Sequence, residues 1–325
     1  MSGMKRFVLA FLLLSLPFMA YTQIIKERRV YYLDCSFSME LNKDVVSGKP
    51  LWDLVRDNLK KAIDNVSDET TELVVIPFAF DSQPNPTLSP ISAKATAAGK
   101  EMIKSKIDGL PMNKKTMTYH YVPIEDFYNN QVADDRITYM FLMTDGQDED
   151  PRQRAKNLLK EWGSKFGNKN VFGFYVMLCN NAKSSKIEEI VEQQDHLWKV
   201  ETADININLV RLKDNKVFNK RIDRELLTIE VEQGSLSNCP IEILETICDG
   251  DYYMIDDKLR VEENRIICKI LPKNDSLILP EETMMTLRFK PVSPSKANSF
   301  TCLVNDKISI KCKDKKEKTL KIRFE

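Results

Sequence analysis

Residues 137–146 read ITYMFLMTDG, and this stretch decides the fold class. A continuous apolar run that stops at a turn signal is typical of a strand buried on both faces of a parallel sheet. Thr144 and Asp145 place polar oxygen atoms at the carboxyl end of that strand. Three further segments have the same character, at 29–34 (RVYYLD), 73–80 (LVVIPFAF) and 171–178.

Helical periodicity fills the intervals between these strands. Apolar residues recur at helical spacing over 51–66, and helices are also predicted at 93–107, from Pro123, at 152–166 and at 186–193. A weak strand at 197–200 and a helix at 205–212 close the series. Parallel strands need crossover helices, so residues 28–216 are predicted to form a doubly wound α/β domain. Such domains hold their sites at the carboxyl ends of the central strands.

The pattern changes after residue 225. Short, often alternating segments separated by turn signals predict a smaller all-β sandwich over 225–325. They lie at 226–232, 241–248, 258–262, 265–271, 284–289, 301–304, 308–311 and 320–324.

Length and composition agree with two folded domains and exclude several functions. The chain has 325 residues, with 48 basic and 48 acidic side chains and only two histidines. A formal charge of zero removes the electrostatic attraction on which nucleic-acid binding relies. Two histidines also disfavour His-rich zinc sites and His-dependent catalytic triads.

The first 22 residues have the form of an export signal. Lys5 and Arg6 precede an apolar run of about 13 residues, too short for the ~20 that span a bilayer. Cleavage before Gln23 would leave a mature protein without a transmembrane segment, in the periplasm, on the cell surface or secreted. An uncleaved membrane anchor is the alternative.

Export permits disulfides, but seven cysteines cannot all pair within one chain. Cys302 and Cys312 flank a turn-like stretch, so they either bridge a hairpin or remain free buried thiols.

Three polar clusters are expected at the carboxyl edge of the predicted sheet. Asp34, Ser36 and Ser38 follow the first strand, Thr116 and Thr118 lie in the loop before the Pro123 helix, and Asp145 ends the 137–144 strand. All offer hard oxygen ligands and none offers nitrogen or sulfur. Mg²⁺ suits this set best, with Mn²⁺ or Ca²⁺ as alternatives, and zinc does not.

The D-x-S-x-S motif at Asp34, the loop threonine and the T-D-G at Asp145 resemble the metal-ion-dependent adhesion site of von Willebrand factor A (VWA) domains. The resemblance covers residues 28–216, with the elements in family order. It implies a Rossmann-like fold, a divalent cation held by Asp34, Ser36, Ser38, a threonine and Asp145, and a protein ligand that presents Asp or Glu. It also points to the final helix, at 205–212, as the element that would transmit ligand binding to the sandwich.

The chain departs from the family at the loop threonine, where two lysines replace the usual glycines before Thr116. Thr118 fits the spacing of the following helix better, and Thr116 stays the alternative. Phe37 and His120 lie near the site and are candidate partner contacts.

These residues favour an exported, metal-dependent adhesion or protein-binding module over an enzyme. The alternatives are a metal-dependent phosphatase or hydrolase that uses Asp34 or Cys35, and a structural envelope component whose metal site is inactive.

Overall fold

The computed structural model describes residues 26–79, 89–112, 117–178, 185–201, 205–213, 216–218, 225–237, 239–256, 258–274, 282–292 and 299–313. The α/β part holds one six-stranded sheet in the order β3-β2-β1-β4-β5-β6. All neighbours are parallel except β3, which pairs antiparallel with β2. The strands are β1 (Lys26–Asp34), β2 (Glu72–Phe78), β3 (Ile91–Lys94), β4 (Arg136–Thr144), β5 (Val171–Met177) and β6 (Leu197–Val200). The doubly wound, mostly parallel sheet is therefore confirmed.

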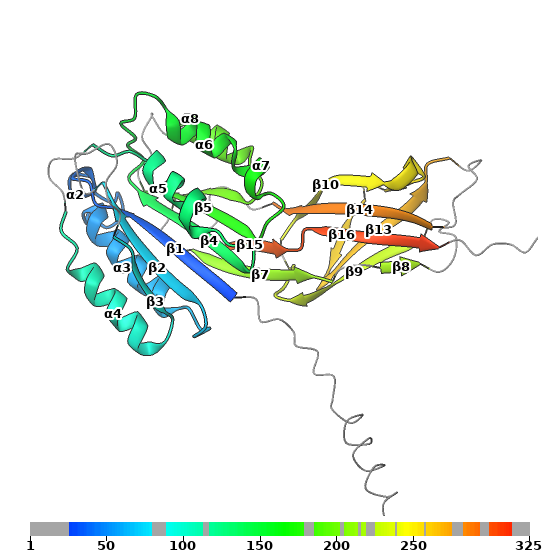
Figure 1. The fold of residues 1–325 in the computed structure, drawn as a ribbon, viewed down its shortest axis with the longest axis horizontal. Coiled ribbons are helices and arrows are strands. Elements are labelled where there is room, and N and C mark those ends of the chain that lie inside the picture. The colour runs from blue at the N-terminus through cyan, green and yellow to red at the C-terminus, as the bar shows by residue number, and fades with distance from the viewer. Residues whose placement is uncertain are drawn as a thin grey trace, which may run out of the picture.

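Helices cover both faces of this sheet (Figure 1). One face packs against α2 (Ser38–Leu41), α3 (Leu51–Asp64) and α4 (Ala97–Asp108). The other packs against α5 (Tyr121–Asp126), the π-helical turn η1 (Phe127–Gln131), α6 (Arg154–Lys160), α7 (Trp162–Phe166) and α8 (Ser185–Glu192). The side chains of β1 alternate between the two cores, Val30 and Tyr32 on one side and Tyr31 and Leu33 on the other.

Most predicted elements of this part are present within a few residues of their predicted bounds, and two differ more clearly. The helix expected at 93–107 begins at Ala97, because Ile91–Lys94 joins the sheet edge as β3 and the Thr96 side chain caps the helix by accepting from the Gly99 amide. The helix expected at 152–166 divides at Glu161 into α6 and α7.

The remaining strands form two sheets that pack face to face. One has the order β10-β14-β16-β8, and the other has β11-β13-β9-β7-β15 with β12 paired to β13. The strands are β7 (Asn206–Leu212), β8 (Lys216–Phe218), β9 (Leu226–Gln233), β10 (Ile241–Cys248), β11 (Tyr253–Ile255), β12 (Arg260–Glu262), β13 (Arg265–Pro272), β14 (Glu282–Pro291), β15 (Ser299–Val304) and β16 (Lys307–Lys313), with a 3₁₀ turn η2 (Asp249–Asp251). The predicted all-β character is confirmed for these residues, while the strand at 320–324 lies outside them.

Residues 205–212 are not a helix, which is the main correction to the sequence analysis. Asn206–Leu212 is strand β7, parallel to β15 and antiparallel to β9. In Figure 1 the β7–β15 pair lies between the α/β part and the other strands. The physical reason is a partner distant in sequence, because β15 pairs with β7 along its length.

The β7–β15 pair, which we call the ribbon, contributes to both hydrophobic cores. Phe300, Cys302 and Val304 of β15 pack into the α/β core, and Leu303 between them packs into the sandwich core. In β7, Leu209 packs against the first core and Val210 belongs to the second. Period-2 alternation therefore assigns successive side chains to different domains. The predicted domain boundary at 216–225 stays a prediction. The two cores are joined by the ribbon, whose side chains pack into both of them.

Charged side chains also join the two parts. Arg288 of β14 donates to the Gly167 carbonyl at 2.9 Å and pairs with Asp195 at 2.8 Å and Asp306 at 3.4 Å. Lys290 pairs with Asp195 at 3.3 Å. Arg288 is mostly shielded from solvent, so this network holds the sandwich against the α8–β6 corner.

Six cysteines are described, and none of the six forms a disulfide. Cys302 and Cys312 are buried thiols in β15 and β16, which belong to different sheets, so the predicted hairpin bridge is wrong and the alternative of unbridged buried thiols is correct. Cys179 and the proposed signal segment lie outside the described residues. Among the helices of the described part, none is long and apolar enough to cross a membrane.

Candidate metal centre

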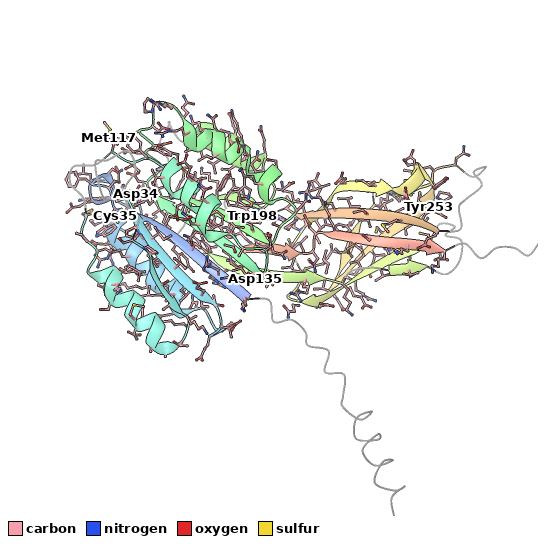
Figure 2. All side chains as sticks on the ribbon, viewed as in Figure 1. Asp34, Cys35, Met117, Asp135, Trp198 and Tyr253 are labelled. Carbon is pink, nitrogen blue, oxygen red and sulfur yellow. The ribbon has the colours of Figure 1, made fainter. Side chains whose placement is uncertain are left out.

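The site lies at the carboxyl edge of the central strands, at the end of the α/β part opposite the sandwich (Figure 2). Asp34 ends β1 and Thr144 ends β4, and the parallel register sets these two strand ends side by side. The sheet topology therefore brings together two clusters that are 110 residues apart in sequence.

The first loop turns back on Asp34. The Ser36 amide donates to Asp34 Oδ1 at 2.9 Å, and the Ser36 and Ser38 hydroxyl oxygens lie 2.9 Å apart. Both hydroxyls are therefore close enough to share one ligand with the Asp34 carboxylate. Asp34 and Ser36 are buried and Ser38 is half-buried, which leaves the loop open on its Ser38 side.

Asp145 is also fully buried, and its carboxylate is fixed from two directions. The Asn42 side-chain amide donates to Oδ2 at 2.8 Å, and the Gln147 amide donates to Oδ1 at 3.0 Å. Asn42 follows α2, so the first loop and the Asp145 loop are directly bonded. The sequence analysis missed Asn42, whose role depends on the contact between loops and has no local signal.

Thr118 is held beside the Asp145 loop by its backbone. Its amide donates to Glu149 Oε2 at 2.8 Å, and its carbonyl accepts from the Glu149 amide at 2.9 Å. Thr118 is buried, with 3% of its surface exposed. Thr116 lies outside the described residues, so the assignment of the loop threonine to Thr118 stays a prediction.

His120, expected as a partner contact, is fully buried behind the site, and we correct that expectation. With Asp34 ionised, the Thr144 hydroxyl donates to Asp34 Oδ2 at 2.7 Å, so the Thr144 oxygen must accept from His120 Nε2 at 3.1 Å. The other ring nitrogen, Nδ1, is hydrogen-bonded to the Tyr175 hydroxyl. This buried chain fixes the orientation of Asp34, as outer hydrogen bonds do for metal ligands. Phe37 is half-buried and remains available at the rim.

The electrostatics favour a cation. Burial raises the pKa of the Asp34 carboxyl; His120 opposes the rise, and the nearby Asp145 carboxylate adds to it. Two carboxylates are thus held close together in a buried site, and a positive ion would stabilise both charges. Among the described residues no group of three or more His, Cys, Asp or Glu side chains could hold a metal. The further side-chain oxygens beside Asp34 belong to the Ser36, Ser38 and Thr144 hydroxyls. That donor set fits a hard divalent cation.

Comparisons with known proteins find distant likenesses only among solved structures. No protein-family model matches the sequence, and no curated protein matches it. A von Willebrand factor type A structure from Catenulispora acidiphila is 13% identical over 92% of this chain and 69% of that chain, with a TM-score of 0.37. An aerotolerance-related membrane protein from Bacteroides fragilis is 14% identical over 46% and 67%, with a TM-score of 0.35. A pilus adhesin from Lactobacillus rhamnosus GG is 12% identical over 89% of this chain, which spans 44% of the adhesin, with a TM-score of 0.41.

These likenesses are too distant to support an argument about activity. The doubly wound sheet and the loops that follow β1 and β4 agree with the fold that the sequence resemblance implies. We call the six-stranded sheet with its helices the α/β domain. Strand β7 of the ribbon stands at the residues where the resemblance predicts the final helix.

Proposed function

We propose that the chain is a metal-dependent protein-binding module of the adhesion type, which binds an aspartate or glutamate of a partner protein through a divalent cation. One observation supports this most strongly. Two fully buried carboxylates, Asp34 and Asp145, lie among hydroxyl groups at the open edge of the sheet. Mg²⁺ is the proposed ion, with Mn²⁺ and Ca²⁺ as alternatives.

The charges of the ligands favour binding of an acidic group. Asp34 and Asp145 would balance a divalent cation, and Ser36, Ser38 and Thr118 would add only neutral oxygens. A bound ion would keep its Lewis acidity and accept one further carboxylate at a coordination position that faces outward. The residues of this chain hold and orient that position, and Asn42 and Thr144 fix the two carboxylates.

We propose no enzymatic activity. Burial raises the pKa of the Cys35 thiol, and its Sγ donates to the Leu33 carbonyl inside the α/β core. A buried thiol of raised pKa is a poor nucleophile. Both ring nitrogens of His120 are already hydrogen-bonded, so that ring has no free position to serve as a base. These contacts give the hydrolase alternative no support at Cys35.

Export remains part of the proposal. It rests on Lys5, Arg6 and the apolar run that follows them, which have the form of a cleaved signal. A periplasmic, cell-surface or secreted location would expose the metal site to partner proteins outside the cytoplasm.

Isothermal titration with Mg²⁺ tests the metal assignment. We expect the wild-type protein to bind one ion and Asp34→Asn, which keeps the shape of the side chain, to lose that binding. Asp306→Asn is the matched control, because Asp306 is also a buried aspartate but lies in the turn between β15 and β16. Equal affinity in the wild type and Asp34→Asn would refute the assignment.

A further inference from the structure

The apolar side chains exposed on the α/β domain are concentrated near its proposed metal site. In the described part of residues 26–201, the exposed large hydrophobic side chains are Leu41 (64%), Val45 (99%), Val46 (95%) and Met117 (56%). The first three follow the proposed ligand Ser38 in helix α2 and the next turn, and Met117 lies beside the proposed ligand Thr118. We call these four residues the apolar rim. Exposed apolar side chains gathered at one place usually mark a binding surface.

Each rim residue is connected closely to a ligand. Leu41 ends α2, which begins at the ligand Ser38, and Met117 directly precedes Thr118. Figure 2 shows Met117 and Asp34 at the same end of the molecule, far from Tyr253 in the sandwich. The rim and the metal site therefore face the same partner.

The two valines occupy the tip of a short hairpin, residues 43–50, whose base is next to the site. The Leu51 amide donates to the Asn42 carbonyl at 2.9 Å, and the Asn42 side chain contacts Asp145 at 2.8 Å. A displacement of this base would therefore move a contact of the proposed ligand Asp145.

The hairpin is well defined by its own hydrogen bonds. The Asp44 amide donates to the Lys49 carbonyl at 2.9 Å, the Gly48 amide donates to the Asp44 carbonyl at 2.9 Å, and the Ser47 amide donates to Asp44 Oδ2 at 2.6 Å. Gly48 has a φ of +68°, a conformation that favours glycine. The tip is thus preorganised, so a partner that buries it loses little free energy in ordering the loop.

We infer that the partner is a protein segment in which the acidic residue is flanked by aliphatic side chains, which contact the apolar rim while the carboxylate reaches the ion. This inference rests on the proposed function and adds the chemistry next to the carboxylate. A membrane surface is disfavoured, because the exposed Lys43 and Lys49 near the rim are balanced by the exposed Glu40 and Glu149, which leaves no net positive charge to attract anionic lipid.

The test is selection of a displayed library of random linear peptides on the full chain, in Mg²⁺ and in EDTA. We expect the wild type to enrich, in Mg²⁺ only, peptides with an acidic residue beside Leu, Ile or Val. The double variant Val45→Ser/Val46→Ser should keep Mg²⁺-dependent acidic enrichment without the aliphatic preference. Val292→Ser is the matched control, since Val292 is an exposed valine in the sandwich part.

Titration of one selected synthetic peptide measures how much the two valines contribute to peptide affinity. Burying a valine side chain is expected to strengthen binding about tenfold, so the double variant should bind that peptide about a hundredfold more weakly than the wild type. Its Mg²⁺ affinity, measured by calorimetry without peptide, should be unchanged. Both exposed valines are replaced by a polar residue, so folding is not at risk.

Three outcomes would overturn the inference, and they are distinguishable. Acidic enrichment without aliphatic neighbours would refute the rim while leaving the proposed function in place. Equal enrichment in Mg²⁺ and EDTA would refute the proposed function itself. No peptide enrichment, together with valine-dependent flotation on phosphatidylcholine–phosphatidylserine vesicles, would identify a membrane surface as the partner instead.

Discussion

Replacing Phe300 with alanine tests whether the ribbon is part of the α/β core. Phe300 belongs to β15, near the end of the sequence, yet its side chain is fully buried among residues of the six-stranded sheet. Its ring lies 5.3 Å from the Phe174 ring, edge to face, and 5.8 Å from the Trp198 ring. Phe300→Ala would therefore open a cavity inside the α/β domain, although the mutation is in the last 26 residues of the chain.

The expected loss of stability is large. Deleting a buried phenyl group costs about 3–5 kcal/mol, and we expect the upper half of that range because two aromatic contacts of about 0.5–1.5 kcal/mol each are lost with it. The total free energy of unfolding of a natural domain is about 5–15 kcal/mol. The variant should still fold, with much of its stability removed.

Tryptophan fluorescence during urea unfolding measures the loss of stability in the α/β domain itself. All three tryptophans, Trp52, Trp162 and Trp198, lie in the α/β part. We expect Phe300→Ala to shift their transition to lower urea, in one step that coincides with the transition seen by far-ultraviolet circular dichroism.

A companion variant, Phe289→Ala, removes an equally buried phenyl group from the sandwich core alone and tests whether the two parts unfold together. Because the ribbon is hydrogen-bonded into the sandwich sheet, we expect this variant to shift the same transition. An unchanged tryptophan transition in Phe300→Ala would show that the ribbon does not pack on the six-stranded sheet, and the fold argument would fail.

Two further predictions concern buried polar groups. Tyr175→Phe leaves Nδ1 of buried His120 without its hydrogen-bond partner, so we expect a loss of about 1–3 kcal/mol in urea unfolding and weaker Mg²⁺ binding in calorimetry. Tyr139→Phe is the control, because the Tyr139 hydroxyl has no partner in the described part of the chain, and this variant should be near neutral. Equal effects of the two variants would contradict the assignment. Burial lowers the pKa of His196 to about 4, so this residue makes the protein less stable as the pH falls from 6.5 to 4. Burial raises the pKa of Asp306 from 3.8 to about 6, so this residue makes the protein less stable as the pH rises from 3.8 to 6. We expect the two opposed contributions largely to cancel in the wild type. In Asp306→Asn only the histidine contribution remains, so the free energy of unfolding measured in urea should fall by about 3 kcal/mol between pH 6.5 and 4. A free energy of unfolding that does not change with pH in this variant would refute the prediction.

The central strands could be predicted because the apolar character of each segment alone indicates a buried strand. Segments such as 137–144 are so uniformly apolar that only a strand buried on both faces suits them, and the polar residues that end them identify the site edge. Asp34 and Asp145 followed from that reasoning, since neighbouring parallel strands must end together.

The helix predicted at residues 205–212 was wrong because the local sequence pattern fits both a helix and a strand. Ile205, Leu209 and Leu212 fit a helical face, whereas Ile207 with Leu209 and Val210 with Leu212 fit two faces of a strand. The choice is made by β15, about 90 residues later, which supplies the hydrogen-bond partners. The Tyr175–His120 contact was missed for a similar reason, because it joins a strand to a loop that precedes it by 55 residues.

The presence of strand β7 instead of a helix also affects how ligand binding could be transmitted from the α/β domain to the sandwich. An isolated final helix satisfies its own backbone hydrogen bonds and can slide along a sheet without breaking them. β7 cannot, because residues 206–211 pair with β15 in six successive positions and its end pairs with β9. Sliding would leave buried amide and carbonyl groups unpaired, at about 1–3 kcal/mol for each group. The coupling route that the sequence resemblance suggested therefore has no free element among the described residues, and the structure favours an α/β domain held rigidly on its sandwich.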